Sequence, residues 1–402
     1  MRKFFLKLFS FFTGESKFKN ILQFVLCLIM LGLAIWLAVN DVVSNMFGAA
    51  LGFIFSTLVL RLIKMISLGF EDSLKINFDT DALLNKYYKD SNYRKTLTLN
   101  GTSVDFAYAE NICNTAHTKH ILDIDDNPDK MMELDEFIGG HFDTLYSAHK
   151  GSSKSNSLTV RLDSFESTDG KHILHLSRST VFNHLVTNRA IDFELFDKTT
   201  LRDVFEFGPT LSKYEDSKMS NHVGINGVVF LKDGNILVPH RNRQSTVSKN
   251  KVTSSIAVKL NPPAKKQKIT KEYFFEQTII DNLTKRTRIP ADILSKENIT
   301  IDFLGFGQSV YEGGKPQFYF AVHLKDIDTA KYHQVYTKSV KEKMLDEDKC
   351  IYVADFDSFH FNRQSKLVFD CITAKGKRKK KTLGYEMSYL ANLWHYMKSL
   401  NE

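Results

Sequence analysis

The chain has 402 residues, 43% of them hydrophobic, and a formal charge of +8 at pH 7. This length exceeds one small domain and leaves room for two compact units beyond the N-terminal region. The four cysteines include no CxxC pair; they are Cys27, Cys113, Cys350 and Cys371. They argue against a disulfide framework and against a cysteine-ligated zinc site.

Residues 1–19 are basic and rich in phenylalanine. Lys3 and Lys7 alternate with bulky apolar side chains in the stretch MRKFFLKLFSFF. Such a segment is typical of a short helix that lies in the headgroup plane of a lipid bilayer. A disordered basic leader is the alternative.

Two long apolar runs follow the leader. The first, Ile21–Val39, has 19 residues and no formal charge, and the second extends from Met46 to Leu60. A bilayer core takes about 20 apolar helical residues, so we expect a two-helix transmembrane hairpin over residues 20–68. A secretory signal peptide would need a small-residue cleavage site after the first run, and a second run follows instead.

The flanking charges predict an orientation for this hairpin. The turn between the runs carries only Asp41, whereas basic residues lie outside both runs: Arg2, Lys3, Lys7, Lys17, Lys19, Arg61 and Lys64. By the positive-inside rule, both termini and the rest of the chain face the cytoplasm. Gly48, Gly52 and Ser56 recur at four-residue spacing and could pack helices within one hairpin or between copies.

Residues 69–203 predict a β-rich extension. Apolar residues alternate on either side of Asn100-Gly101, a strong two-residue hairpin signal. A second hairpin is expected from 158–162 and 173–176. The acidic run 123–129 lacks the glycine and glutamate of a calcium loop, because Pro128 and Leu134 stand at those places. We interpret it as a solvated turn.

Residues 204–402 predict a mixed sheet with helices. The stretch HVGINGVVFLKDGNILVPHRNR gives a hairpin around Asp233-Gly234, and a strand follows at 254–260. An amphipathic helix then places Phe275, Ile279 and Leu283 on one face and stops before Pro290. Two further strands, ITIDFLGFG and QFYFAVHL, complete the pattern. The fold class expected is therefore α+β with a mixed sheet.

This order of elements resembles a NUDIX domain, which we place at 204–402. Together with LHLSRSTVFNHLVTNR upstream, the chain is similar to the NUDIX-like domains associated with bacterial cyclic-oligonucleotide synthases. With a two-helix anchor it resembles the two-transmembrane NUDIX effectors of CBASS anti-phage systems. The resemblance implies a bacterial inner-membrane protein that binds a cyclic oligonucleotide, forms homo-oligomers on activation and disrupts the bilayer.

The chain departs from the NUDIX family at the catalytic box. Hydrolases of this family carry REUxEExGU on the helix, and its glutamates bind Mg²⁺ or Mn²⁺ beside the diphosphate. Here Lys285 and Arg286 replace the paired acids, and Arg288 replaces the glycine. Glu272 and Glu276 are too few and lie too far upstream. We expect no catalytic residues, no metal site and no cofactor, and the basic residues could equally form a solvated helix end.

The expected ligand-binding residues share polar, cationic or aromatic chemistry on strand ends and loops: Arg241, Arg243, Lys259, Ser254, Asn226, Tyr311, Lys315 and Arg286. Guanidinium groups bind phosphate bidentately, and an aromatic ring stacks on a base. The basic run 375–381 suits nucleic acid or anionic lipid, but we expect no specific nucleic-acid partner.

The first functional hypothesis is thus a membrane-anchored sensor of a cyclic oligonucleotide. The alternative is a membrane-bound NUDIX nucleoside-diphosphate hydrolase with a displaced metal site. A third hypothesis is a nucleic-acid-binding membrane protein led by the 375–381 cluster.

Overall fold

The computed structural model describes residues 76–401, apart from 90, 148, 150–154, 169–170, 242–249, 264–266, 295 and 343–347. Residues Glu71–Glu402 form one compact unit. The strands are β1 Arg94–Leu99, β2 Thr102–Cys113, β3 Ile121–Met131, β4 Leu158–Thr168, β5 Lys171–Thr180, β6 Gly224–Phe230, β7 Ile236–Arg241, β8 Lys251–Val252, β9 Ile256–Lys259, β10 Ile299–Ser309, β11 Lys315–Leu324, β12 Asp348–Ala354, β13 His360–Phe361, β14 Leu367–Ile372 and β15 Arg378–Tyr385. The helices are α4 Thr80–Lys86, α5 Glu136–Gly140, α6 Phe142–Ser147, α7 Val181–Val186, α8 Leu201–Phe205, α9 Thr278–Thr287, α10 Thr329–Glu342 and α11 Met387–Asn401.

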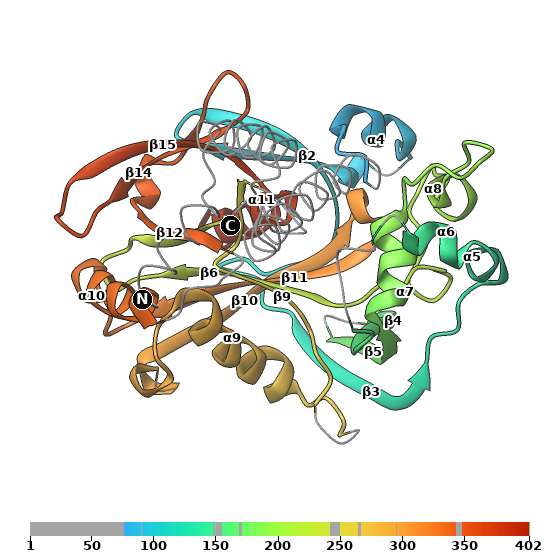
Figure 1. Cartoon of the computed structure of the whole chain (residues 1–402), viewed down its shortest axis with the longest axis horizontal. Helices are drawn as coiled ribbons and strands as arrows, with labels where there is room; N and C mark the ends of the chain where they lie inside the picture. Colours follow the sequence, from blue (N-terminus) through green and yellow to red (C-terminus); the bar gives the residue numbers. More distant parts are fainter. Residues whose placement is uncertain are drawn as a thin grey trace, which may run out of the picture. The chain divides into compact units, whose positions relative to one another are not determined.

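Most strands belong to one large mixed sheet. Its order is β1-β2-β10-β11-β6-β7-β12-β14-β15-β8, with β9 added beside β6 and β13 beside β14. Because β8 also pairs with β7, the strands β7, β12, β14, β15 and β8 close into a five-stranded barrel. A separate sheet has the order β3-β5-β4 (Figure 1).

The middle of the large sheet is covered on both faces. Along β11, Phe318, Phe320 and Val322 pack with the apolar face of α9. The alternate residues Tyr319 and Ala321 pack with α11. Figure 1 draws α9 and α11 on opposite sides of β6 and β11. Strands buried on both faces are apolar throughout, which explains the sequence QFYFAVHL.

Several local predictions are confirmed. Asn100 and Gly101 both have positive φ, 46° and 72°, as a tight turn between β1 and β2 requires. The hairpins β4–β5 and β6–β7, the strands β9, β10 and β11, and the amphipathic helix are present where expected. A π-helical turn, Tyr273–Gln277, precedes α9.

The expected fold class, α+β with a two-helix transmembrane hairpin, is wrong. The fold is β-rich, with few helices and a closed five-stranded barrel. Among the described residues, no helix is long and apolar enough to cross a membrane. The predicted hairpin, 20–68, and the leader, 1–19, lie outside the described residues.

The β-rich extension is continuous with the later strands. β2 pairs with β10 in antiparallel register, with Cys113 opposite Gly305. The sheet therefore crosses the boundary that the sequence places between Asp203 and Val204. Strand pairing between distant segments leaves no local signal in the sequence.

The acidic run 123–129 is a strand and not a solvated turn. It forms the middle of β3, which pairs with β5 in parallel. Asp126 is buried and accepts two hydrogen bonds from Arg178, at 2.6 and 2.8 Å. The backbone N–H of Ile269 donates to the same carboxylate at 2.7 Å. Arg178 neutralises the charge of this buried carboxylate, so the run is stable inside a strand.

We expect Asp126→Asn to destabilise the fold by about 3–5 kcal/mol, because it leaves the guanidinium of Arg178 buried without a counter-charge. Urea unfolding followed by circular dichroism measures the change. The matched control is Asp123→Asn on the same strand, whose exposed pair with Lys271 is worth no more than about 1 kcal/mol. Equal effects of the two substitutions would contradict the assignment of Asp126 as the key buried charge.

Candidate functional site

Three strand ends meet at one edge of the large sheet. β6 and β11 are parallel, with Gly224 opposite Gln317, so both strands begin at this edge. β9 is antiparallel to β6 and ends there, with Lys259 opposite Gly224. The topology thus brings Lys259 and Lys315 toward the same place, although 56 positions separate them in the sequence.

Two histidines lie at this edge, one on α7 and one just before β6. His222 lies two residues before β6, and its ring stacks on that of His184 from α7, with centroids 3.5 Å apart and planes at 29°. Both side chains are buried. Val223 N–H donates to the Val160 carbonyl at 2.9 Å, which joins β4 to the start of β6. The site therefore lies where the two sheets meet, beside α7 (Figure 1).

The surrounding cations keep both imidazoles neutral. Burial lowers the pKa of His222 well below its usual range, and the positive charges of Lys315, Lys259 and Arg189 lower it further. The pKa of His184 is lowered by burial first, and then by His222, Lys315 and Arg189. Burial also lowers the pKa of the Lys259 amine. Three cations thus surround two uncharged rings that can each donate one N–H.

Buried polar atoms without partners collect at the same junction. Within the described residues, Nδ1 of His184, Nδ1 of His222, Nδ2 of Asn221 and Oγ1 of Thr159 have no hydrogen-bond partner. A buried polar group left unpaired costs about 1–3 kcal/mol. The histidine and asparagine atoms are suited to an anionic acceptor, because the lysines supply the charge that such a group needs.

A chain of hydrogen bonds links Asn226 to Lys315. Asn226 Nδ2 donates to Gln317 Oε1 at 2.7 Å, and Gln317 Nε2 donates to Glu312 at 3.4 Å. Lys315 Nζ donates to the same carboxylate at 3.2 Å. Gly224 makes room for this chain, because a Cβ there would lie 2.1 Å from Gln317 Oε1.

Three of the eight predicted ligand residues gather here: Asn226, Lys259 and Lys315. Tyr311 lies in the short turn before β11, but its hydroxyl bonds to Thr80 at 2.8 Å and accepts from the Ala107 N–H at 3.0 Å. Its side chain is buried in another cluster of the core, so its ring is not available to stack on a base.

The other predicted residues lie elsewhere. Ser254 is buried and accepts a hydrogen bond from Asn392 of α11 at 3.2 Å. Arg241 ends β7 and stands opposite Asp348 of β12. Arg243 lies outside the described residues.

Arg286 is remote from the lysines. It lies in the last turn of α9, and the adjacent Thr287 carbonyl accepts a hydrogen bond from Tyr332 at 2.9 Å. Tyr332 follows the far end of β11, whose ten residues span about 30 Å.

Sequence reasoning missed His184, His222 and Arg189. His184 and Arg189 lie in the stretch quoted for the family resemblance, and His222 begins the following one. The sequence shows that these residues are histidines and an arginine, but 38 positions separate the two histidines and neither belongs to a recognisable motif.

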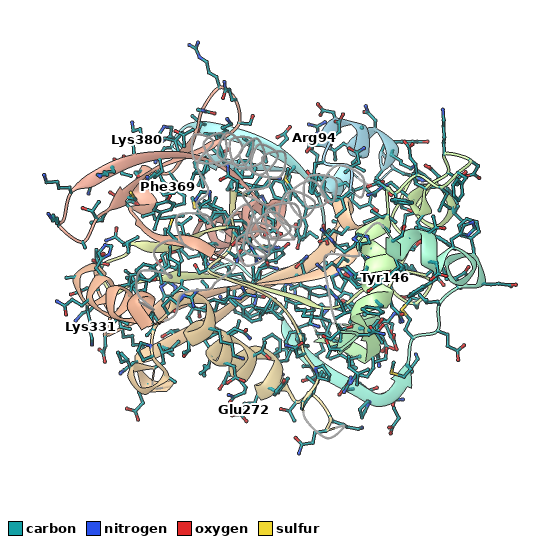
Figure 2. All side chains as sticks on the ribbon, viewed as in Figure 1. Arg94, Tyr146, Glu272, Lys331, Phe369 and Lys380 are labelled. Carbon is teal, nitrogen blue, oxygen red and sulfur yellow. The ribbon has the colours of Figure 1, made fainter. Side chains whose placement is uncertain are left out.

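The helix that resembles the NUDIX helix carries cations at its end. Lys285 and Arg286 occupy the last turn of α9. Glu272 is exposed on the outer side of this helical segment (Figure 2). In the described part of the chain, no group of three or more histidine, cysteine, aspartate or glutamate side chains is arranged to hold a metal ion.

The basic run 375–381 forms the turn before β15 and the first half of that strand. Arg378 pairs with Asp355 at 2.7 Å, and Lys381 Nζ lies 5.1 Å from the centre of the Tyr352 ring. Lys380 projects from the outer side of the barrel (Figure 2). Strand edges commonly carry lysines that oppose pairing with another chain, so this run does not by itself define a binding site.

Comparison with known proteins adds no relative. A scan against protein-family models and a search of curated proteins both find no significant match to this chain.

We expect the folded protein to lose stability in acid partly through His222. Below about pH 6.5 the unfolded chain protonates this histidine while the native state keeps it neutral. The free energy of unfolding therefore falls as pH falls, by up to about 1.4 kcal/mol per pH unit for one group. Urea unfolding of His222→Asn between pH 6.5 and 4.5 should show a shallower loss than wild type. His117 is exposed, so His117→Gln serves as the control. If the free energy of unfolding falls equally steeply with pH in wild type and His222→Asn, the expectation is refuted.

Proposed function

We propose that this protein is a receptor that binds a phosphate-containing nucleotide, of the cyclic-oligonucleotide class, without hydrolysing it. The observation that carries the proposal is the convergence of Lys259, Lys315 and Arg189 around the stacked pair His184–His222. Two lysines and one arginine against the single carboxylate of Glu312 leave a local excess of positive charge. Such a cluster favours an anion.

The donors suit a phosphodiester. Phosphate oxygens accept charge-assisted hydrogen bonds from lysine and arginine, and neutral imidazole and amide N–H groups add direction. Asn226, held by Gln317, and Gly224 place polar backbone and side-chain groups beside these cations. A cyclic oligonucleotide presents several phosphodiesters and is the ligand implied by the NUDIX-like resemblance.

The end of α9 supports binding over hydrolysis. Diphosphate cleavage by a NUDIX enzyme depends on divalent cations held by glutamates. Lys285 and Arg286 stand in the last turn of this helix, where two positive charges repel such cations. Within the described residues, no cluster of metal-ligating side chains favours a displaced metal site, so the hydrolase alternative receives no separate support.

The remaining parts of the expected function concern the bilayer and association between copies. Membrane disruption and an inner-membrane location depend on residues 20–68, which lie outside the described part of the chain. Both stay predictions, as does homo-oligomer formation on activation.

Lys259→Ala and Lys315→Ala should each weaken nucleotide binding about tenfold or more, because one charge-assisted hydrogen bond contributes roughly 1.5–3 kcal/mol. Isothermal titration of the full chain with cyclic di-AMP, cyclic di-GMP, cyclic AMP–GMP and cyclic tri-AMP measures the affinity. Lys232→Ala, on the exposed turn after β6, is the matched control and should leave affinity unchanged.

The outcomes separate the two possible cation clusters. If Lys285→Ala weakens binding while Lys259→Ala and Lys315→Ala do not, the ligand binds at the end of α9 and the proposed site is wrong. If none of the four nucleotides binds to correctly folded protein, the proposed function fails.

We also expect no turnover of nucleoside diphosphate derivatives with Mg²⁺ or Mn²⁺. Turnover is measured by chromatography, as phosphate or nucleotide released by the pure protein. Steady metal-dependent release that Glu276→Gln abolishes would overturn the expectation, since Glu276 is the glutamate nearest in sequence to the positions of the family's paired acids.

A further inference from the structure

The histidine pair has a consequence for how an anion would bind. His184 and His222 are stacked with their ring centres 3.5 Å apart, and each is more than nine-tenths buried. Their Nδ1 atoms have no partner within the described residues. An imidazole is the one side chain whose ordinary titration falls close to neutral pH, so its environment decides its charge.

The groups that face this pair are mostly cationic. η2, Asn188–Ala190, supplies Arg189, while β9 and β11 supply Lys259 and Lys315. η7, Val310–Glu312, supplies Glu312, which already pairs with Lys315. β4 supplies Arg161, which pairs with Asp163. Glu312 and Asp163 thus each form an ion pair with a lysine or an arginine and not with a histidine. Without a ligand, His184 and His222 therefore stay neutral.

A bound phosphodiester would reverse this balance. Held by Lys259 and Lys315, it places a negative charge next to the imidazoles and offsets the lysine charges. An opposite charge within about 4–6 Å favours the protonated form of a histidine. Only one ring of a stacked pair can hold a proton, because the second positive charge would meet the first at contact distance.

We propose that the His184–His222 pair takes up one proton from solvent when a phosphodiester binds, so that this protein binds its ligand more tightly at acidic than at neutral pH. The inference rests on the proposed function and adds its regulation. The proton moves from water to one ring nitrogen of the pair, and no other bond is made or broken.

Linkage gives the size of the effect. If anion binding raises the proton affinity of the pair, protonation raises the anion affinity by the same factor. One linked proton changes the affinity by at most about tenfold per pH unit. The affinity should begin to rise as pH falls below the pKa of the liganded pair. It should level off only where the free pair is also protonated, well below the ordinary histidine range.

The test counts protons directly. The full chain is titrated with the tightest binder of the four cyclic oligonucleotides, at pH 6.5, in two buffers with different ionisation enthalpies. The phosphodiesters do not titrate near this pH, so the difference in heat reports protons taken up by the protein. We expect uptake close to one proton per bound ligand, and affinity that rises as pH falls.

His222→Asn separates titration from hydrogen bonding. The asparagine amide stands where Nδ1 stood and can donate a hydrogen bond, but it cannot titrate. In the single variant His184 could still accept the proton, so the same change is also made at His184. We expect the double variant His184→Asn/His222→Asn to bind ligand with much reduced proton uptake and a flatter pH dependence. His117→Asn, on an exposed loop, is the matched control and should behave like wild type.

Each outcome decides something different. Binding without proton uptake overturns this inference and leaves the proposed function intact. Uptake that persists undiminished in the double variant His184→Asn/His222→Asn places the proton elsewhere and overturns it too. Absence of any nucleotide binding overturns both. If the double variant does not fold, the wild-type protein alone decides, because a pH-independent affinity contradicts the linkage.

Discussion

The parallel pairing of β6 with β11 is the constraint on which the described fold depends. Both strands are buried on both faces, by α9 on one side and α11 on the other. Parallel strands begin at the same edge of a sheet, and the antiparallel β9 ends at that edge. The candidate site depends on these strand directions. If β11 ran antiparallel to β6, Lys315 would lie at the opposite end of the strand from Lys259.

Local features of this fold could be predicted from the sequence, and long-range ones could not. Asn100-Gly101 specifies its turn through positive φ, and the spacing of Phe275, Ile279 and Leu283 specifies a helix face. From the sequence alone the acidic run 123–129 is interpreted as a solvated turn, because the partner that neutralises Asp126, Arg178, lies 52 positions away. Closure of the five-stranded barrel likewise depends on β7 meeting β8.

The candidate site shows the same division. Residue type alone selected Lys259, Lys315 and Tyr311 equally, since each has suitable chemistry and lies beside a strand end. Side-chain direction separates them: the Tyr311 hydroxyl bonds to Thr80 and Ala107 in another part of the core. Sequence reasoning missed His184 and His222 because their significance comes from contact with each other, and a single sequence carries no trace of that contact.

The unpartnered atoms of the junction give the site its physical logic. Burial lowers the pKa of His222, and the nearby cations lower it further. Neutral histidines buried in this way add no stabilising charge to the fold. Local inconsistencies of this kind tend to mark functional or strained positions. Here the inconsistency has a direction: among the described residues, the side-chain charges that lower the pKa values of the two histidines belong to Lys259, Lys315 and Arg189. The bound anion that we propose would offset these charges, offer an acceptor to the unpartnered polar atoms and shift the histidines toward their ordinary titration.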